Sequence, residues 1–359
     1  MGEALPIEER LKKTRFITVS SGKGGVAKTT TSAGLALSFS ELGLRTLLVE
    51  QDYGNPSAHK YLGLDGTVDP EKGKGAGEIL LGKTTDISQL VHPTFPHDPR
   101  LQQRFSRLQF MTCGRDEVNE RSKRTDFQKG YRSLREQTEA QRYNIVILDM
   151  PAGDSPYVLD GILRSTRVVI LNPDVHYNSR DGIIRLLRNS RHRGVEIASK
   201  LLKLPTSIIK ELNIVLDGKM EKKERDVLLG NLYQLVTSNP EYSNLLEEFE
   251  RIKRYVMEFG AYAIATNADK AKCSPGMQDL IVEASKFGLK IEELTTIPFS
   301  GTIRDAYPFY YYNPEIENWD EAVEGIPSPV NSIRTARDQL LKVLQMPTSE
   351  EIKQFCGAR

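Results

Sequence analysis

The chain has 359 residues, of which 39% are hydrophobic and 27% are charged, and its formal net charge is +1. This composition is typical of a globular protein with a sizeable core. The near-zero net charge excludes a whole-chain electrostatic field that would draw the protein to nucleic acid or membrane, so any such contact requires a local patch.

Apolar runs alternate with helical patterns along the chain, which predicts an α/β fold with a doubly wound, mostly parallel sheet. We expect one domain over residues 1–359, with a helical insertion at 219–258 and a C-terminal tail at 346–359. The expected strands are 15–20, 46–50, 108–111, 143–149, 168–171, 212–216, 262–266 and 294–298. The expected helices are 28–42, 78–81, 127–142 and 329–345, with loops at 66–77 and 92–107.

A glycine-rich loop lies between the first expected strand and the first expected helix. Strand, glycine-rich loop and helix in this order place backbone N–H groups and a helix N-terminus around an anion. Lys28 could reach the terminal phosphates of a nucleotide, and Thr29 could hold a magnesium ion. The expected nucleotide-binding residues of the loop are Gly22, Lys23, Gly24, Gly25, Val26, Ala27, Lys28, Thr29 and Thr30.

Ala27 stands where the general pattern G-x-x-x-x-G-K-[ST] has its last glycine. A negative φ at this position would suit alanine, whereas a positive φ would cost roughly 1–2 kcal/mol. We expect a negative φ at Ala27.

Asp149 ends the clearest buried strand of the sequence. A phosphate loop needs a carboxylate at the carboxyl end of a parallel strand to hold the magnesium shell. Asp149 is suited to that role, and the alternative is an ordinary cap or turn residue.

The loop is similar to that of the MinD/ParA family of deviant phosphate-loop ATPases, which belongs to the SIMIBI class. The family pattern K-G-G-x-x-K-[ST] is matched from Lys23 to Thr29, and the segment 149–153 resembles the D-x-P-A-G segment of MinD-like members. The resemblance implies ATP and Mg²⁺ as cofactors. It also implies that Lys23 reaches across a homodimer interface to the partner subunit's nucleotide.

The segment Glu50-Gln51-Asp52 occupies the place where family members show D-x-D. By resemblance, Asp52 orients or activates the attacking water, a role that a carboxylate near the γ-phosphate can fill. Together with Lys23 and Lys28 it completes the expected catalytic set. Glu50 either serves the metal ion, with Thr29 and Asp149, or is the buried end of a strand paired to a lysine.

The base-binding residues have two competing candidates. Asn267, with a closing loop at Pro298, resembles the adenine pocket of the family, and the segment 216–219 is the alternative. The string from Asn267 to Lys270 also resembles guanine-binding loops, so guanine stays an alternative to adenine.

Two segments indicate partner surfaces. Residues 171–181 resemble a stretch at the dimer face of MinD-like proteins. Residues 180–203 contain seven Lys or Arg against two acidic residues, a balance of +5 by count. Such a run could bind DNA or an anionic membrane, or be a solvated helix face. The tail has few large apolar residues, so we do not expect it to anchor the protein in a membrane.

The sequence favours a partner-stimulated ATPase switch that dimerises around ATP and positions or regulates the assembly of a cellular cargo, as in partitioning or division. A non-catalytic nucleotide-dependent scaffold is the first alternative. A metal-cluster carrier is the second, but Cys113, Cys273 and Cys356 form no C-x-x-C pair. With no apolar run of about 18 residues, we expect a cytoplasmic protein, with a peripheral position on nucleoid or membrane as an alternative.

Overall fold

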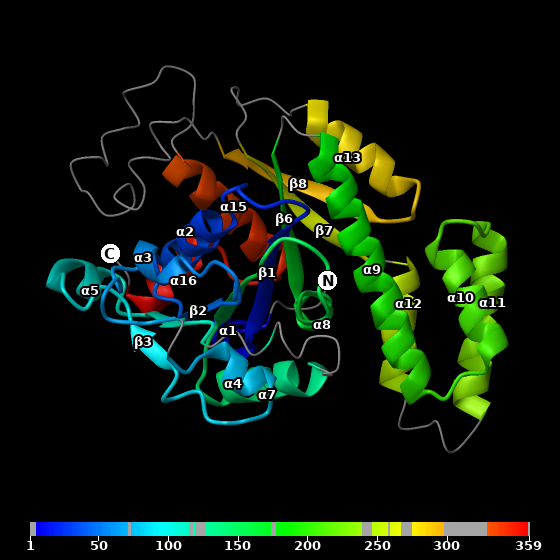
Figure 1. Ribbon diagram of the computed structural model, residues 1–359, viewed down its shortest axis with the longest axis horizontal. Coiled ribbons are helices and arrows are strands. Elements are labelled where there is room, and N and C mark those ends of the chain that lie inside the picture. Colours follow the sequence, from blue (N-terminus) through cyan, green and yellow to red (C-terminus); the bar gives the residue numbers. More distant parts are fainter. Residues whose placement is uncertain are drawn as a thin grey trace.

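The computed structural model describes residues 5–70, 73–114, 118, 127–173, 177–238, 246–257, 259–266, 275–297 and 329–357. Within these ranges the strands form one eight-stranded sheet in the order β3-β4-β2-β5-β1-β6-β7-β8 (Figure 1). Neighbouring strands are parallel except at the edge, where β3 runs antiparallel to β4. The strands are β1 (Arg15–Ser21), β2 (Thr46–Glu50), β3 (Val91–Pro93), β4 (Leu108–Met111), β5 (Ile145–Asp149), β6 (Arg167–Pro173), β7 (Gly260–Thr266) and β8 (Lys290–Ile297).

Helices cover both faces of the sheet, so the expected α/β class is confirmed. One core packs β-strand side chains against α2 and α15, through residues such as Leu35 and Leu340. The opposite core packs them against α4, α7, α8, α9 and α13, through residues such as Leu134 and Leu280. The helices of these two layers are α2 (Lys28–Glu41), α4 (Ala76–Leu80), α7 (Gln128–Ala140), α8 (Pro156–Arg164), α9 (Tyr177–Leu201), α13 (Pro275–Ser285) and α15 (Pro329–Val343). The remaining short helices are α1 (Ile7–Lys12), α3 (Ala58–Tyr61), α5 (Pro99–Arg104) and α16 (Ser349–Cys356).

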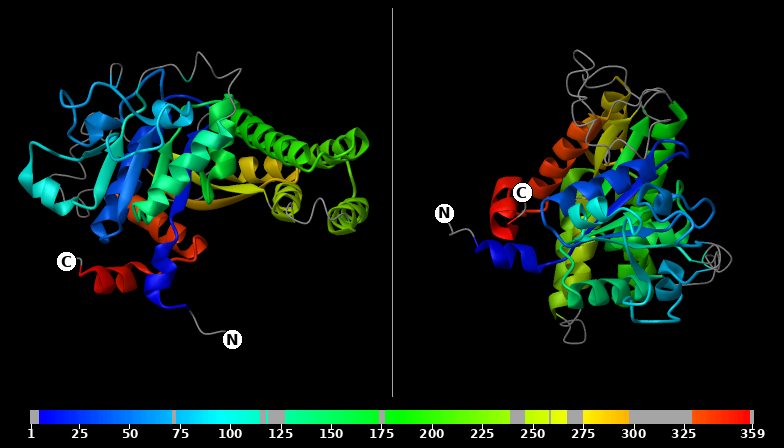
Figure 2. Two further views of the ribbon diagram at one scale, coloured as in Figure 1. Left: turned by 90° about the horizontal axis from the view of Figure 1, so that it is seen from below. Right: turned by 90° about the vertical axis from the view of Figure 1, so that its left-hand side faces the viewer.

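A helical arm projects from the sheet (Figure 2). The arm consists of the distal part of α9 with α10 (Thr206–Leu216), α11 (Lys222–Ser238) and α12 (Leu246–Met257). It has a hydrophobic core of its own, which includes Leu212, Leu232 and Ile252. The expected insertion at 219–258 thus contains α11 and α12, and α10 packs with them.

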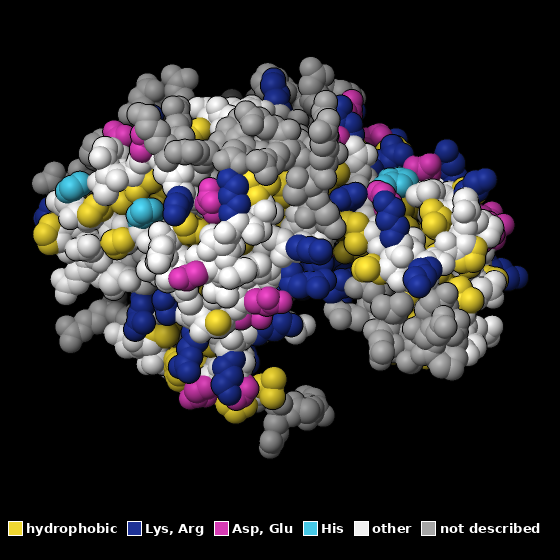
Figure 3. All heavy atoms as spheres, turned by 60° about the horizontal axis from the view of Figure 1, so that its bottom comes forward, with side chains coloured by type: hydrophobic (Ala, Val, Ile, Leu, Met, Phe, Trp, Pro, Cys, Tyr) yellow, Lys and Arg dark blue, Asp and Glu magenta, His cyan; other side chains and the backbone are white. Residues whose placement is uncertain are grey.

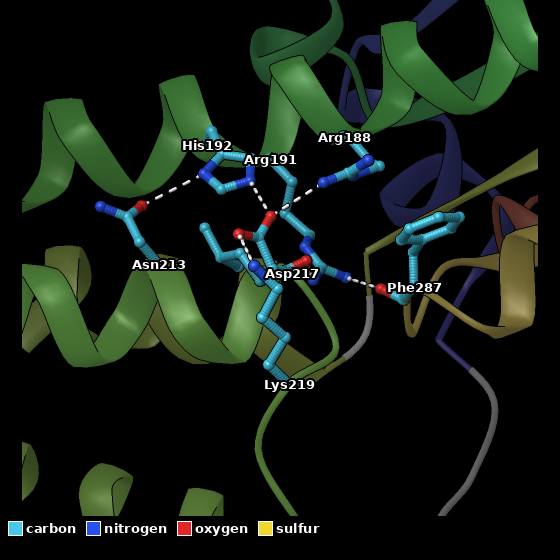
Figure 4. A network of polar contacts seen from close by, with 8 residues as sticks. Arg188, Arg191, His192, Asn213, Asp217, Lys219 and Phe287 are labelled. Atoms are coloured by element: carbon cyan, nitrogen blue, oxygen red, sulfur yellow. Dashed lines mark hydrogen bonds and ion pairs between the residues drawn. The ribbon is translucent and has the colours of Figure 1, made fainter.

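Arg191 of α9 holds the arm to the sheet layer. Its buried guanidinium donates from Nη1 to the carbonyl oxygens of Phe287 (3.0 Å) and Gly288 (3.1 Å), and from Nη2 to that of Leu216 (Figure 4). One side chain therefore caps the C-terminal end of α10, where helix carbonyls lack partners in the helix, and ties it to the turn that follows α13. Beside it, Arg188 donates from Nη2 to Oδ1 of Asp217 at 2.8 Å.

The strand expected at 212–216 is wrong, because these residues end helix α10. A short apolar run fits a buried strand or a buried helix equally well by periodicity alone. The sheet has no gap for a strand here, since β6 pairs directly with β7. The loop expected at 92–107 also contains part of β3 and all of α5. None of the described helices is both long and apolar enough to span a membrane.

Candidate nucleotide site

The glycine-rich loop connects the carboxyl end of β1 to the first turn of α2. Lys23, Gly24 and Gly25 are exposed, and a Cβ placed on either glycine would meet no atom within 4 Å. The side chain of Val26 is buried in the core and anchors the loop there. The loop therefore presents open backbone above a fixed base, which is the geometry that lets N–H groups approach a phosphate.

Ala27 adopts φ +64° and ψ 32°, so the expected negative φ is wrong. The residue is left-handed because the loop must turn directly into α2, where the Ala27 carbonyl accepts a hydrogen bond from the Thr31 N–H at 2.9 Å. An alanine in this conformation costs roughly 1–2 kcal/mol relative to the right-handed region. Gly25 shares the left-handed geometry with φ +72°, and alternating backbone handedness of this kind forms an anion-binding concavity.

Lys28 begins α2 and is buried. Burial lowers the pKa of its ammonium group, whereas the nearby carboxylates of Asp149 and Asp52 raise it. The structure thus brings together three residues that are far apart in the sequence. Lys28 supplies the positive charge directly behind the loop, as phosphate binding requires.

Asp149 ends β5 under the first turn of α2 and is almost completely buried. Its Oδ1 accepts a hydrogen bond from Ser32 Oγ at 2.8 Å, and Oδ2 has no hydrogen-bond partner among the described residues. Burial raises the pKa of Asp149 to about 6, against the lowering effects of Ser32, Thr29 and Lys28. A buried carboxylate oxygen without a partner, beside a threonine hydroxyl, fits the oxygen-rich surroundings that Mg²⁺ prefers.

Glu50 ends β2 and is fully buried. Its Oε1 accepts hydrogen bonds from the backbone N–H groups of Ser57 and Ala58, both at 2.6 Å, at the start of α3. Burial raises the pKa of Glu50 to about 7. The carboxylate therefore holds the loop after β2 through hydrogen bonds from backbone N–H groups. These groups take the place of the lysine that the sequence suggested as a possible partner of Glu50. Its service to a metal ion stays a prediction.

Asp52 lies half-buried in the loop between β2 and α3. Its Oδ1 accepts a hydrogen bond from the Asn55 N–H at 3.1 Å. This side-chain hydrogen bond closes the turn over residues 52–55. The carboxylate is close enough to Lys28 to raise the pKa of the ammonium group. This position suits the expected contact with the attacking water.

Two features of the site escaped the sequence prediction. Gln51 Oε1 accepts a hydrogen bond from the Tyr131 hydroxyl of α7 at 2.6 Å, so the loop after β2 is linked to the opposite helix layer. Gly22 lies against the first turns of α9, where a Cβ on Gly182 would come within 2.6 Å of the Gly22 carbonyl oxygen. A glycine inside a long helix was the only sequence signal of this contact.

The remaining expected residues either make few contacts with the site or lie outside the described residues. Gly153 has φ +99° and donates its N–H to the Ser21 carbonyl at 3.4 Å, so the 149–153 segment lies against the loop. Asn172 is buried and donates from Nδ2 to the Gly276 carbonyl at 3.4 Å. Asn267 and Pro298, the expected base-binding residues, lie outside the described residues.

A family model described as an AAA domain matches residues 14–201, which include the loop, Asp52 and Asp149. The chain belongs to the MinD/ParA family of P-loop ATPases. A putative septum site-determining protein MinD from Mesostigma viride is 28% identical over 163 residues, 45% of this chain and 51% of that protein. The chromosome-partitioning ATPase Soj from Thermus thermophilus is 28% identical over 175 residues, 49% of this chain and 61% of that protein.

The match thus spans about half the length of the MinD protein and about three fifths of the length of Soj. The solved structure of a Cyanothece McdA variant in complex with ATP is similar over 93% of this chain and 98% of that one, with a TM-score of 0.54 and 13% identity. At this identity, the likeness shows the fold of a MinD/ParA-family ATPase. The family model ends at the tip of α9, so the distal arm lies outside it.

Proposed function

We propose that the protein is a Mg²⁺-dependent ATPase that forms an ATP-sandwiched homodimer and acts as a switch in positioning or regulating a cellular assembly. The observation that carries this proposal is the grouping of Lys28, Thr29 and Asp149 behind an open loop, with one buried Asp149 oxygen that has no partner among the described residues. These groups match what a triphosphate and its metal ion need. The similarity to MinD, Soj and McdA proteins supports ATP and a role in division or partitioning.

Each residue has a separate task in this proposal. Lys28 and the loop N–H groups bind the phosphates, and Thr29 with Asp149 would hold Mg²⁺, which supplies charge neutralisation on the phosphates. Asp52 orients the water. Lys23 is exposed on the loop and would contact the nucleotide of the partner subunit. Adenine recognition by Asn267 and Pro298 remains part of the proposal.

The test is phosphate release combined with sizing of the protein in ATP, in ADP and without nucleotide. We expect a dimer in ATP that returns to monomer after hydrolysis, at a slow basal rate that a partner protein increases. Asp52→Ala should bind ATP and stay dimeric, because the water loses its orienting carboxylate. An ATP-loaded Asp52→Ala variant that is strictly monomeric would overturn the mechanism. Nucleotide binding and dimerisation without phosphate release would assign the scaffold role instead.

The partner surfaces of this switch are also proposals. Several cations of residues 180–203 already have carboxylate partners: Arg185 with Asp154, Arg188 with Asp217, Arg193 with Asp160 and Lys200 with Glu196. Arg191 is used for structure. Because these cations are already paired, α9 offers less positive charge to a ligand than the balance of +5 over residues 180–203 predicted. We therefore favour an activating protein over DNA or anionic membrane as the partner of this helix.

A metal-cluster role has less support. Cys113 is buried, and burial raises the pKa of its thiol to about 12, which disfavours the thiolate that a metal requires. Cys356 lies exposed on α16, and Cys273 lies outside the described residues. An iron assay of the purified protein tests this alternative directly.

A further inference from the structure

A groove separates the body of the protein from the arm, at the amino ends of the strands and thus opposite the glycine-rich loop. It consists of two adjoining cavities of about 460 Å³ and about 360 Å³. The two cavities share Leu163, Arg167, Arg254 and Tyr255 among their lining residues. Figure 3 shows Lys and Arg side chains gathered in the hollow between body and arm. We call this feature the basic groove.

The smaller cavity is lined by six cationic side chains and, among the described residues, by no carboxylate. These cations are Lys13, Arg135, Arg164, Arg167, Arg251 and Arg254. They come from five places in the chain, namely the segment before β1, α7, α8, β6 and α12. The larger cavity adds Lys290, which is paired with Glu292. Six like charges around one cavity repel one another, and a bound anion would relieve this repulsion.

The like charges are close enough to affect one another. Burial lowers the pKa of Arg15, beside the groove, and the neighbouring guanidinium groups of Arg167 and Arg135 lower it further. Burial also lowers the pKa of Arg135, where Glu139 at 3.6 Å opposes the shift and Arg251 adds to it. Glu139 offsets this charge only in part and does not line the cavity.

Backbone contacts hold two of the guanidinium groups in place. Arg167 donates to the carbonyl oxygens of Thr166 and Val343, each at 2.8 Å, and Arg135 donates to the Arg164 carbonyl. The side chains of Lys13 and Arg254, in contrast, are exposed and have no hydrogen bond or ion pair to the described residues. The groove therefore combines fixed arginines with two cations that are available to a ligand.

The larger cavity has an aromatic wall beside its polar residues. The rings of Tyr255 and Phe259 meet edge to face with centroids 5.9 Å apart, and both line the larger cavity. Tyr255 is seated on α9, since a Cβ on Gly194 would lie 2.6 Å from its Cε2. Tyr255 also lines the smaller cavity, so its ring lies where the two cavities meet.

We propose that the basic groove binds a small phosphate ester with at least two phosphate groups, its phosphates on the arginines and its organic group against Tyr255 and Phe259. Guanidinium forks match phosphate oxygens in pairs, and aromatic rings accept a planar or apolar group. The cavity volumes are those of small-molecule sites. Because α12 forms one wall and the strand starts form the other, the bound ligand links the arm to the body.

Calorimetric titration of the full chain with adenosine 3′,5′-bisphosphate and with inorganic tripolyphosphate tests this proposal. Both titrations are done in a Lys28→Ala background, so that the glycine-rich loop does not compete. We expect both probes to bind, and the Lys13→Gln/Arg254→Gln pair to weaken both by about tenfold or more. Tyr255→Leu should weaken the bisphosphate more than tripolyphosphate, which has no organic group.

The matched control is Arg132→Gln/Lys210→Gln, which removes two exposed positive charges outside the groove. It should bind both probes as the parent does. Absence of binding by the parent protein, or equal weakening in the control, would overturn the proposal. Tighter binding of a single-stranded oligonucleotide or a glutamate-rich peptide, lost in the Lys13→Gln/Arg254→Gln pair, would also overturn it in favour of a macromolecular partner.

Discussion

Glu50 of β2 and Asp149 of β5 occupy the same register position on neighbouring parallel strands. Both carboxyl groups are buried on the α2 side of the sheet, and burial raises the pKa of Glu50 to about 7 and that of Asp149 to about 6. The charge of Asp149 adds to the shift of Glu50. The floor of the site therefore resists full ionisation, and a cation bound at Asp149 relieves this cost.

We predict that Glu50 makes stability depend on pH. Its pKa is raised from 4.5 to about 7, so the native state binds the proton more tightly than the unfolded state does. The free energy of unfolding then falls as pH rises between these two values and the loss is complete above the higher one. In metal-free protein, Glu50→Gln should be more stable than the parent near pH 8 by about 1–3 kcal/mol. Near pH 5 this difference in the free energy of unfolding should be smaller, because Glu50 is then protonated in the native state.

Urea denaturation at the two pH values measures this effect. Gln can still accept the hydrogen bonds from Ser57 and Ala58, so the loop after β2 should keep its conformation. An identical pH dependence in parent and variant would show that Glu50 does not titrate in this range.

Lys28 and Lys23 should have separable effects. Lys28→Ala removes the buried charge behind the loop and should weaken nucleotide binding by about a hundredfold or more, measured with a fluorescent ATP analogue. Lys23→Ala removes an exposed side chain and should leave binding by the monomer within about threefold, while ATP-dependent dimerisation is lost. Wild-type affinity in Lys28→Ala would refute the site assignment.

Ala27 should gain stability from replacement by glycine. Its φ of +64° strains a residue with a Cβ, so Ala27→Gly should raise the free energy of unfolding by about 1 kcal/mol. Gly25→Ala is the converse change at φ +72° and should lower it by a similar amount. Chemical denaturation without nucleotide reads out both. A destabilising Ala27→Gly would contradict the left-handed conformation of the loop at this residue.

Gly182 should couple α9 to the nucleotide site. A Cβ at this position would lie 2.6 Å from the Gly22 carbonyl oxygen, so Gly182→Ala must displace the helix or the loop. We expect a loss of about 1–3 kcal/mol in stability together with weaker nucleotide binding. The matched control is Gly230→Ala on α11, where nothing lies within 4 Å and helix propensity should add about 0.5–1 kcal/mol. Equal effects of the two changes would argue against the contact.

Most strands could be predicted because central parallel strands are buried on both faces and read as continuous apolar runs, as from Ile145 to Leu148. The same rule failed at Leu212–Leu216, where a run of similar length packs inside the arm as part of α10. The two runs differ in what they pack against. The residues of an apolar run do not show by themselves whether neighbouring strands or other helices will cover it.

The sequence by itself determined the phosphate loop and the carboxylate that ends β5, because phosphate binding depends on local backbone shape and on residue types at short spacings. Tertiary structure decided the rest. The handedness of Ala27 follows from how the loop enters α2, the partners of Glu50 from where α3 begins, and the contact of Gly22 with Gly182 from how α9 crosses the sheet. The cations of the basic groove come from four separate stretches of the chain, at 13, 135, 164–167 and 251–254, and become one site only when the sheet and the arm pack together.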